Sequence, residues 1–541
     1  MKSLHTTILT LLLLATAGCS SKSTAPTEGA ILNVNLGAEV QDLDPHIVTG
    51  VPEHRATSAL FEGLTDLNPA TMEAIPAAAT SWEVSEDKTV YTFHLRKEAM
   101  WSNGDAVTAH DFAYAWRRML TPALGAEYAY LLYILKNAQA YHEGALTDFD
   151  EVGVKVVDDY TLEVTLAAPT PYFITSHIHY AWYPLHQATI EAHGAIHDRG
   201  TKWTRVENFV GNGAFILTEW APNEVMTLAK NPRYWNRNAV KLDGINFYPI
   251  DDLQTEERSF RSGDLHVTED IPLHRIQVYQ AENPAVLKLA PYLGVYYYRI
   301  NVTKPPFDDK RVRQAFSMAL NREVICRDVM KAGEAPAFTY VPPNCGTYTS
   351  AAPLKYDPEA AKALLTEAGY PNGEGLPKVE MLYNTSDNHK RIAEAMQNIW
   401  KQNLGTDAVR LLNQDWKVYL SSMNALDYQM ARSGWIADVV DPINFLECFL
   451  SNSGNNRTGF KSPAYDALIE QAYIEPDIDK RNAVMQEAEA ILLDEAVIIP
   501  IYFYTRKFLM ATEVKGYIDN PLGYMRWEDF YLETIDAEGK V

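Results

Sequence analysis

Helix and strand patterns alternate along this chain, which limits the folds that it can adopt. Asp357 is placed to cap a helix, Pro358 to occupy its first turn and Gly369 to end it, with apolar residues at helical spacing between them. Residues 379–383 follow directly and have the pattern of a strand. This stretch therefore alternates helix and strand, as α/β folds do.

Similar local signals occur elsewhere. Residues 90–95 and 162–166 alternate apolar and polar positions, as half-buried strands do. Thr108 and Asp111 form a capping box ahead of an apolar helical stripe. The longest apolar run, residues 496–504, is interrupted by a proline and is too short to cross a membrane, so we expect a buried strand. No internal repeat or low-complexity linker marks a boundary between lobes.

The first residues have the order of a lipoprotein signal peptide. Lys2 precedes a short leucine-rich run, and small residues then lead to Cys19. We expect a lipoprotein signal peptide over residues 1–19, lipidation of Cys19, and a flexible polar spacer over residues 20–29. Thr16 stands where leucine is commonest in such signals, so an ordinary secreted protein is the alternative. The expected location is the periplasmic side of a bacterial membrane, and either the inner or the outer membrane fits.

The composition is that of a soluble globular protein with two or three lobes, since 541 residues include 47% apolar and 22% charged residues. A net charge of −23 argues against binding to nucleic acid or anionic lipid, because phosphate-binding surfaces need an excess of Lys and Arg. After Cys19 only Cys326, Cys345 and Cys448 remain. Either a Cys326–Cys345 bridge or buried free thiols fit this number.

The sequence contains none of the local motifs of serine hydrolases, zinc proteases, dinucleotide-binding proteins or P-loop proteins. Paired carboxylates leave no local signature, but nothing favours an enzyme, and we expect no catalytic residues and no cofactor. Five of the 14 histidines fall between His177 and His197. Their spacing matches no common metal motif, so they are either metal ligands or ordinary core and surface residues.

Many short segments together resemble the bacterial extracellular solute-binding proteins of family 5, in the oligopeptide-binding branch that serves ABC importers. The matching segments, spread over residues 33–530, are LDPH at 43–46, LFEGL at 60–64, FHLR at 93–96, WSNGD at 101–105, DF at 111–112, NGAF at 212–215, NPRYW at 231–235, KPPFD at 304–308, YNTSD at 383–387 and RSGWIAD at 432–438.

This resemblance implies an α/β fold of the class II periplasmic-binding-protein type, with two lobes joined by a hinge and an additional domain. The expected boundaries are residues 30–61, 190–293 and 508–541 for lobe I, 62–189 for the additional domain II, and 294–507 for lobe III. The implied function is an extracytoplasmic receptor that encloses an oligopeptide and delivers it to a membrane permease. ATP hydrolysis belongs to separate ATPase subunits, and the receptor itself is expected to be a monomer.

The resemblance also implies ligand-binding residues. Asp438 is expected to pair with the α-ammonium of a peptide, since a desolvated amine needs an anion. Arg432 and a protonated His389 are expected to receive its carboxylate. The remaining expected ligand-binding residues are aromatic or offer backbone contacts: Trp435, Trp416, Tyr128, Tyr297, Val51, Ser433 and Gly434. The neighbours Tyr296 and Tyr298 are alternatives to Tyr297.

Two departures from the family pattern affect specificity and rigidity. Thr49 stands where some oligopeptide binders have a glutamate, and Gly294 and Ile436 stand where some relatives have a cysteine pair. The alternative function is a receptor of the same fold for another solute, namely a murein peptide, glutathione, haem or nickel. A surface lipoprotein for adhesion or signalling is a third class, and a hydrolase is a remote fourth.

Overall fold

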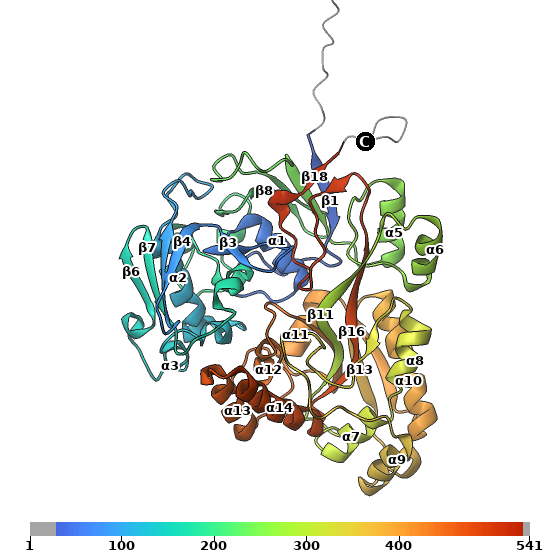
Figure 1. Cartoon of the computed structure of the whole chain (residues 1–541). Helices are drawn as coiled ribbons and strands as arrows, with labels where there is room; N and C mark the ends of the chain where they lie inside the picture. Colours follow the sequence, from blue (N-terminus) through green and yellow to red (C-terminus); the bar gives the residue numbers. More distant parts are fainter. Residues whose placement is uncertain (1–28, 534–541) are drawn as a thin grey trace, which may run out of the picture.

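The computed structural model describes residues 29–533, and the expected signal peptide with Cys19 lies outside this range. A first four-stranded sheet has the order β1-β10-β9-β8, in which β1 and β10 are parallel and the other neighbours antiparallel. The helices α1, α5 and α6 belong to the same part of the molecule (Figure 1). Their bounds are β1 Ile31–Asn35, β8 Phe215–Ala221, β9 Val225–Lys230, β10 Gly244–Tyr248, α1 Val51–Leu60, α5 Leu253–Ser262 and α6 Ile276–Glu282.

A second four-stranded sheet, entirely antiparallel, has the order β4-β5-β7-β6 and lies at one side of the molecule, with α2 and α3 beside it (Figure 1). The bounds here are β4 Ala79–Val84, β5 Val90–Leu95, β6 Val154–Asp158, β7 Thr161–Thr165, α2 Ala109–Leu120, α3 Ala138–His142 and α4 Gln187–Glu191, with a small pair formed by β2 Thr65–Leu67 and β3 Ala74–Pro76.

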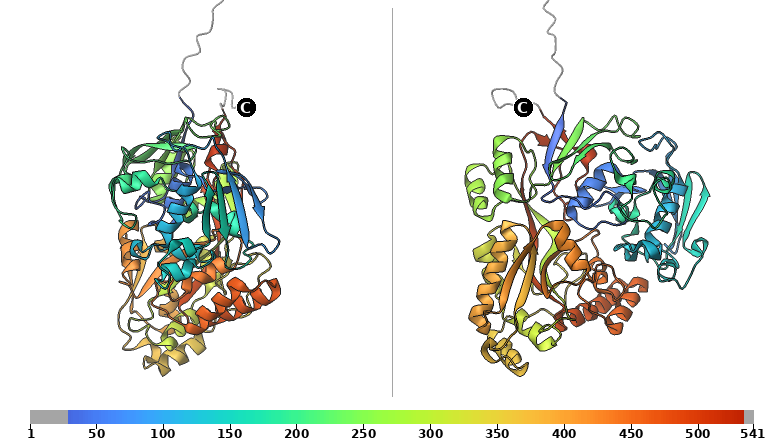
Figure 2. Two further views of the ribbon diagram at one scale, coloured as in Figure 1. Left: turned by 90° about the vertical axis from the view of Figure 1, so that its left-hand side faces the viewer. Right: turned by 180° about the vertical axis from the view of Figure 1, so that it is seen from behind.

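A six-stranded mixed sheet has the order β12-β16-β11-β15-β13-β14. Figure 2 shows from behind that helices flank this sheet in the lower part of the molecule. Its strands are β11 Leu287–Ile300, β12 Ala335–Pro336, β13 Val379–Asn384, β14 Val409–Gln414, β15 Met430–Ile436 and β16 Ile498–Leu509. The helices are α7 Lys310–Met318, α8 Arg322–Val324, α9 Pro358–Glu367, α10 Asp387–Leu404, α11 Trp416–Asn424, α12 Ile443–Leu446, α13 Pro463–Ile474 and α14 Ile478–Asp494.

The helix and strand signals of the sequence are confirmed. Thr108 and Asp111 form the capping box of α2, and the Asp357 side chain caps α9 by accepting a hydrogen bond from the Ala360 amide at 3.0 Å. The two alternating segments are β5 and, one residue earlier than expected, β7. The apolar run that contains Pro500 forms the buried beginning of β16. Within residues 29–533 no helix is long and apolar enough to span a membrane.

Two long strands carry the chain between the first and third parts. β11 and β16 pair antiparallel over most of their length, and the pair runs from the region of β1 and α5 down to α7 (Figure 1). Their register shifts between Pro291 and Val295, opposite Thr505 and Phe503. A bulge of this kind interrupts the hydrogen-bond ladder and bends the strand. The two crossings are therefore interrupted and bent near the middle of the β11–β16 pair.

The last described segment returns to the first part. Met510 forms an antiparallel bridge with Val267, which in turn bridges Val34 of β1. Trp527 is buried, and its indole N–H donates to the Arg55 carbonyl at 3.0 Å in α1. A short pair formed by β17 Val514–Lys515 and β18 Tyr531–Leu532 lies beside it. The first part is thus built from both ends of the described chain, while the exact domain boundaries stay a prediction.

Successive residues of β11 face two hydrophobic cores. Val295 and Tyr297 belong to the large core that extends from the first two sheets to α14, whereas Tyr296 and Tyr298 belong to the core between the six-stranded sheet and α10. This follows from the period of two in a strand. Cys326, Cys345 and Cys448 are buried free thiols. Of the two alternatives for these cysteines, free thiols are confirmed, and the Cys326–Cys345 bridge does not form.

Candidate functional site

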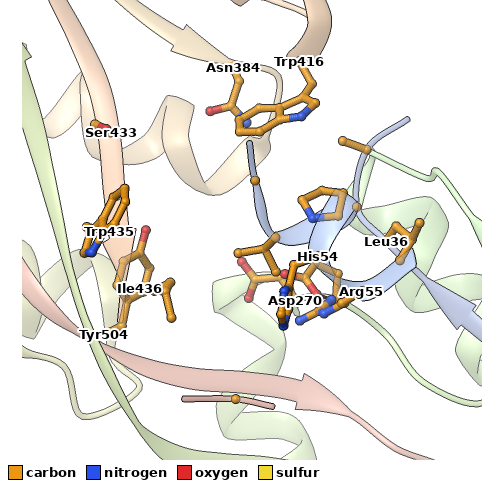
Figure 3. A pocket seen from close by; sticks show the side chains of 18 of the residues that line it. Leu36, His54, Arg55, Asp270, Asn384, Trp416, Ser433, Trp435, Ile436 and Tyr504 are labelled. Carbon is orange, nitrogen blue, oxygen red and sulfur yellow. Dashed lines mark ion pairs between the residues drawn. The ribbon is translucent and has the colours of Figure 1, made fainter. Parts of the chain in front are cut away.

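A cavity of about 350 Å³ lies where the three parts meet. His54 and Arg55 of α1 approach it from one side, and Ser433 and Trp435 of β15 face them across it (Figure 3). Its size and its mixture of apolar walls with a few polar groups are those of a small-ligand site.

Most of the expected ligand-binding residues line this cavity, although they come from distant parts of the sequence. The nine residues that do so are Val51, Tyr128, His389, Trp416, Arg432, Ser433, Gly434, Trp435 and Asp438. That they bind a ligand stays a prediction, but the fold brings them to one place.

Tyr297 does not line the cavity. Its side chain is fully buried, and its ring packs edge-to-face against Tyr340 at 5.2 Å between centroids. The alternatives Tyr296 and Tyr298 do not line it either, since both are fully buried in the core between the six-stranded sheet and α10. The sequence did not reveal how deep this part of β11 lies in the six-stranded sheet.

Asp438 is a largely buried carboxylate just beyond β15, with a side chain that is 20% exposed. The Asn444 side-chain amide donates to it at 3.3 Å, and its own backbone N–H donates to Asn444 at 2.9 Å. Among residues 29–533 no Lys or Arg forms an ion pair with it. Burial therefore raises the pKa of Asp438 to about 7.

His179 lies close to Asp438, with its Nε2 3.6 Å from Asp438 Oδ1. Burial and the neighbouring His54 lower the pKa of His179 well below its usual value, so the ring is neutral near pH 7. Its Nδ1 accepts a hydrogen bond from the Ala181 amide, which assigns the proton to Nε2 and directs it toward Asp438. Asp438 thus has dipolar neighbours but no compensating cation.

Arg432 and His389 lie together at another part of the cavity. The Arg432 guanidinium donates to the Tyr504 hydroxyl at 2.8 Å and lies over the Tyr296 ring at 4.8 Å. Burial and the positive charges of Arg432 and Lys507 lower the pKa of His389 well below its usual value. The expectation of a protonated His389 therefore does not fit this environment: near pH 7 the ring offers a carboxylate an N–H donor rather than a charge.

Side chains from different parts of the molecule are joined by hydrogen bonds beside the cavity. The Trp416 indole N–H, at the start of α11, donates to Glu53 of α1 at 3.3 Å. The Arg457 guanidinium donates to the Thr49 hydroxyl at 3.2 Å. Burial raises the pKa of Glu53 to about 7. The described arrangement of the lobes therefore encloses the cavity from both sides.

The histidines of the 177–197 segment do not form a metal site. His177 is buried among aromatic rings, including Phe173 at 4.9 Å, and His186 caps α4. Within residues 29–533 no group of three or more potential metal ligands is brought together. Of the two readings of this cluster, ordinary core and surface residues fit the geometry.

Sequence reasoning missed several charged residues that line the cavity: Arg55, Arg299, Arg457, Arg506, Lys507 and Asp270. None of them lies in a segment that carries the family resemblance. The one relevant signal was the departure at Thr49, because Thr49 is the residue that Arg457 contacts.

Comparison with known proteins gives consistent matches. Residues 73–457 match the family described as bacterial extracellular solute-binding proteins, family 5 Middle. The chain is 39% identical to the periplasmic oligopeptide-binding protein OppA of Escherichia coli, covering 92% of each chain. Its structure superposes on Haemophilus influenzae OppA in complex with the peptide RPPGFSPFR with a TM-score of 0.88, at 36% identity, over 94% of this chain and 99% of that one.

Two structures of one relative differ in how well they match. The murein tripeptide-binding protein MppA of Escherichia coli superposes with a TM-score of 0.89, at 35% identity, over 94% of this chain and 99% of that one. Its unliganded open form has the same identity and a TM-score of only 0.61, over 94% of this chain and 98% of that one. The lobes of this chain are therefore arranged differently from those of the open form.

The sequence similarity extends over nearly the whole chain, and the structural neighbours share its two α/β lobes with an additional domain. This is the class II periplasmic-binding-protein fold that the resemblance implied. The chain belongs to the bacterial extracellular solute-binding proteins of family 5, in the oligopeptide-binding branch.

Proposed function

We propose that this chain is the extracytoplasmic peptide-binding receptor of an ABC importer, which encloses an oligopeptide between its lobes and delivers it to a membrane permease. The observation that carries the proposal is a free strand edge. β15 pairs with β11 along its whole length, but on its other side β13 pairs only with Met430 and Ala431. From Arg432 to Ile436 that edge has no strand partner among residues 29–533.

An extended peptide fits such an edge, because it adds as a further strand through main-chain hydrogen bonds. The Ala437 N–H donates to Leu293 of β11, and successive residues alternate, so the backbone groups of Gly434 and Ile436 face this edge while those of Ser433 face β11. The ends of the edge have opposite charges, with Arg432 at one end and Asp438 beyond the other. A zwitterionic peptide would place its ammonium at Asp438 and its carboxylate toward Arg432.

The aromatic residues around this edge would form side-chain pockets. Trp416 and Trp435 offer large rigid surfaces that do not demand one side-chain chemistry. A receptor that binds the peptide main chain and has such pockets recognises the ends of a peptide more than its sequence.

Transport requires further subunits, because the sequence has no phosphate-binding loop. The receptor acts as a monomer tethered through lipid on Cys19, and closure of its lobes is the signal that a permease selects. No catalytic step is part of this function.

A second candidate is a receptor for a murein peptide, favoured by the likeness to the murein tripeptide-binding protein. The free edge and Asp438 would serve such a ligand equally well, since it also has an α-ammonium.

Native mass spectrometry of gently purified protein tests the proposal, because tight binders retain their ligands. A series of peptide masses is expected, and a single murein-peptide mass would select the second candidate. A single non-peptide mass, or a stoichiometric metal, would contradict both.

A further inference from the structure

Arg457 is a buried guanidinium at the junction of the lobes. It is 8% exposed and lines the cavity. Its Nη2 donates to the Thr49 hydroxyl at 3.2 Å, but its Nε is buried without a hydrogen-bond partner. Within residues 29–533 no carboxylate forms an ion pair with it. A desolvated charge without a counterion is costly, so such a group calls for an anion.

A second arginine increases the positive charge at this place. Arg299 is also buried, donates from Nε to the Ser433 hydroxyl at 3.0 Å, and has no ion pair among the described residues. Burial and the charge of Arg299 together lower the pKa of Arg457. Glu127 partly offsets this charge, but it pairs with Arg199 at 3.5 Å. The site therefore keeps an excess of positive charge.

This pair of arginines is separate from Arg432. Tyr297 pairs with Ser433 across the β11–β15 ladder, and Tyr298 pairs with Arg432. Residues opposite one another share a face and successive residues alternate, so Arg299 and Ser433 lie on one face and Arg432 on the other. A ligand group at Arg457 is therefore not the terminal carboxylate that Arg432 would receive.

We infer that Arg457, supported by Arg299, Ser433 and Thr49, is the specificity-determining residue of a side-chain subsite for a carboxylate, so that the receptor prefers peptides with an Asp or Glu side chain at one position. This inference rests on the proposed function. Thr49 accepts from one N–H of Arg457 Nη2, and the other Nη2 N–H lies parallel to either the Nε–H or an Nη1 N–H, so one two-pronged edge of the planar guanidinium stays free. A carboxylate accepts two parallel hydrogen bonds from such a fork.

The test is isothermal titration of short alanine peptides in which one residue is Glu, Gln or Lys, with each position scanned. At one position the Glu peptide is expected to bind about 10- to 100-fold more tightly than its Gln counterpart, since hydrogen bonds to charged groups are the strong ones. The Lys peptide is expected to bind most weakly there. In Arg457→Gln the Glu and Gln peptides are expected to bind equally.

Two further variants keep the test decisive if Arg457→Gln folds poorly. Thr49→Glu leaves Arg457 intact but supplies a carboxylate from the protein, so the Glu preference is expected to disappear while the all-alanine peptide still binds. Arg237→Gln removes an exposed arginine that does not line the cavity, and the preference is expected to persist.

Equal affinity for Glu and Gln peptides at every position of the wild type would overturn the subsite, as would a preference that survives in both Arg457→Gln and Thr49→Glu. The all-alanine peptide separates this failure from a wider one. If neither it nor any charged peptide binds, the proposed function fails, and the subsite fails with it.

Discussion

Buried carboxylates in this protein differ in whether a cation accompanies them. Asp44 receives two hydrogen bonds from Arg118, at 2.9 and 2.6 Å, and both side chains are fully buried. Burial opposes ionisation, but the charge and hydrogen bonds of Arg118 lower the pKa of Asp44. Asp438 has no such partner, and burial raises its pKa to about 7. The first carboxylate has its counterion within the fold, whereas the second has no Lys or Arg partner among residues 29–533.

Asp438→Asn is expected to weaken binding of peptides with a free amine by about 2 kcal/mol or more, because a buried ammonium would lose its anion. Titration calorimetry at pH 8 measures the loss. The ligand-free variant is expected to be at least as stable as the wild type at that pH. A carboxylate with a raised pKa destabilises the folded state as the pH rises from about 4 to about 7, and asparagine removes this effect.

The affinity of the wild type is expected to fall as the pH drops below about 7, by up to about tenfold per pH unit, because protonated Asp438 cannot pair with an ammonium. The Asn variant should show a flatter profile. Equal affinities for N-acetylated and free peptides in the wild type would contradict the role given to Asp438.

Arg118→Leu is expected to lower the free energy of unfolding by about 3–5 kcal/mol at pH 7, because Asp44 would remain as an unpaired buried charge. Denaturant unfolding measures the change. Arg117→Leu is the matched control, since Arg117 is the exposed neighbour on the same helix. The difference between the two variants should shrink in acid, where Asp44 is protonated. Equal losses in both would argue against the pair as the cause.

At the scale of elements, the starts of two helices meet beside the cavity. α1 begins after Gly50, which has a φ of 140°, and α11 begins at Trp416. A Cβ atom on Gly50 would lie 2.9 Å from Cζ2 of Trp416 and 2.6 Å from Oε2 of Glu53. Only a residue without a side chain fits both this backbone conformation and this close approach.

Gly50→Ala is therefore expected to weaken peptide binding by about tenfold, because the added methyl group keeps α1 and α11 apart and strains the backbone. Titration calorimetry on wild type and variant measures the effect, with circular dichroism as a check of the fold. Gly144→Ala, at another positive φ but with open space around it, is the control for backbone strain alone. If both variants bind alike, the contact with Trp416 does not matter for closure.

The sequence predicted which segments form helices and strands better than it predicted which of their residues are buried. The caps at Thr108 and Asp357 depend on neighbours three residues away, so local patterns revealed them. The family resemblance identified the β15 region as part of the site. Neither approach showed that Tyr297 faces a core, because that depends on the pairing of β11 with distant strands. Arg457 was missed because its environment is created by Thr49, which lies about four hundred residues earlier.

At the scale of the whole molecule, the paired strands β11 and β16 connect two lobes that close on a cavity. The better match to one relative's structure than to its unliganded open form indicates that the lobes are drawn together here. The contacts from Trp416 to Glu53 and from Arg457 to Thr49 would be lost on opening. We therefore expect closure and ligand binding to be coupled, because a ligand stabilises the state that it contacts on both sides.

Small-angle scattering is expected to show a larger radius of gyration for ligand-free protein than for the structure described, and a return to the smaller value when peptide is added. The same titration of Gly50→Ala should need more peptide for the same change. A radius that is unaffected by saturating peptide in the wild type would contradict coupling between closure and binding.

The return of the C-terminal segment to the first part also affects how the protein is made. β1 and α1 are synthesised early, but the indole that supports α1 belongs to Trp527. At about 5–20 residues per second, the ribosome needs on the order of a minute to reach it. Contacts between segments so far apart in the sequence slow folding, because these segments must meet before their contacts stabilise the fold. The lobe that begins the described chain is thus the last to be completed, and the nascent chain stays incompletely folded until synthesis is nearly finished.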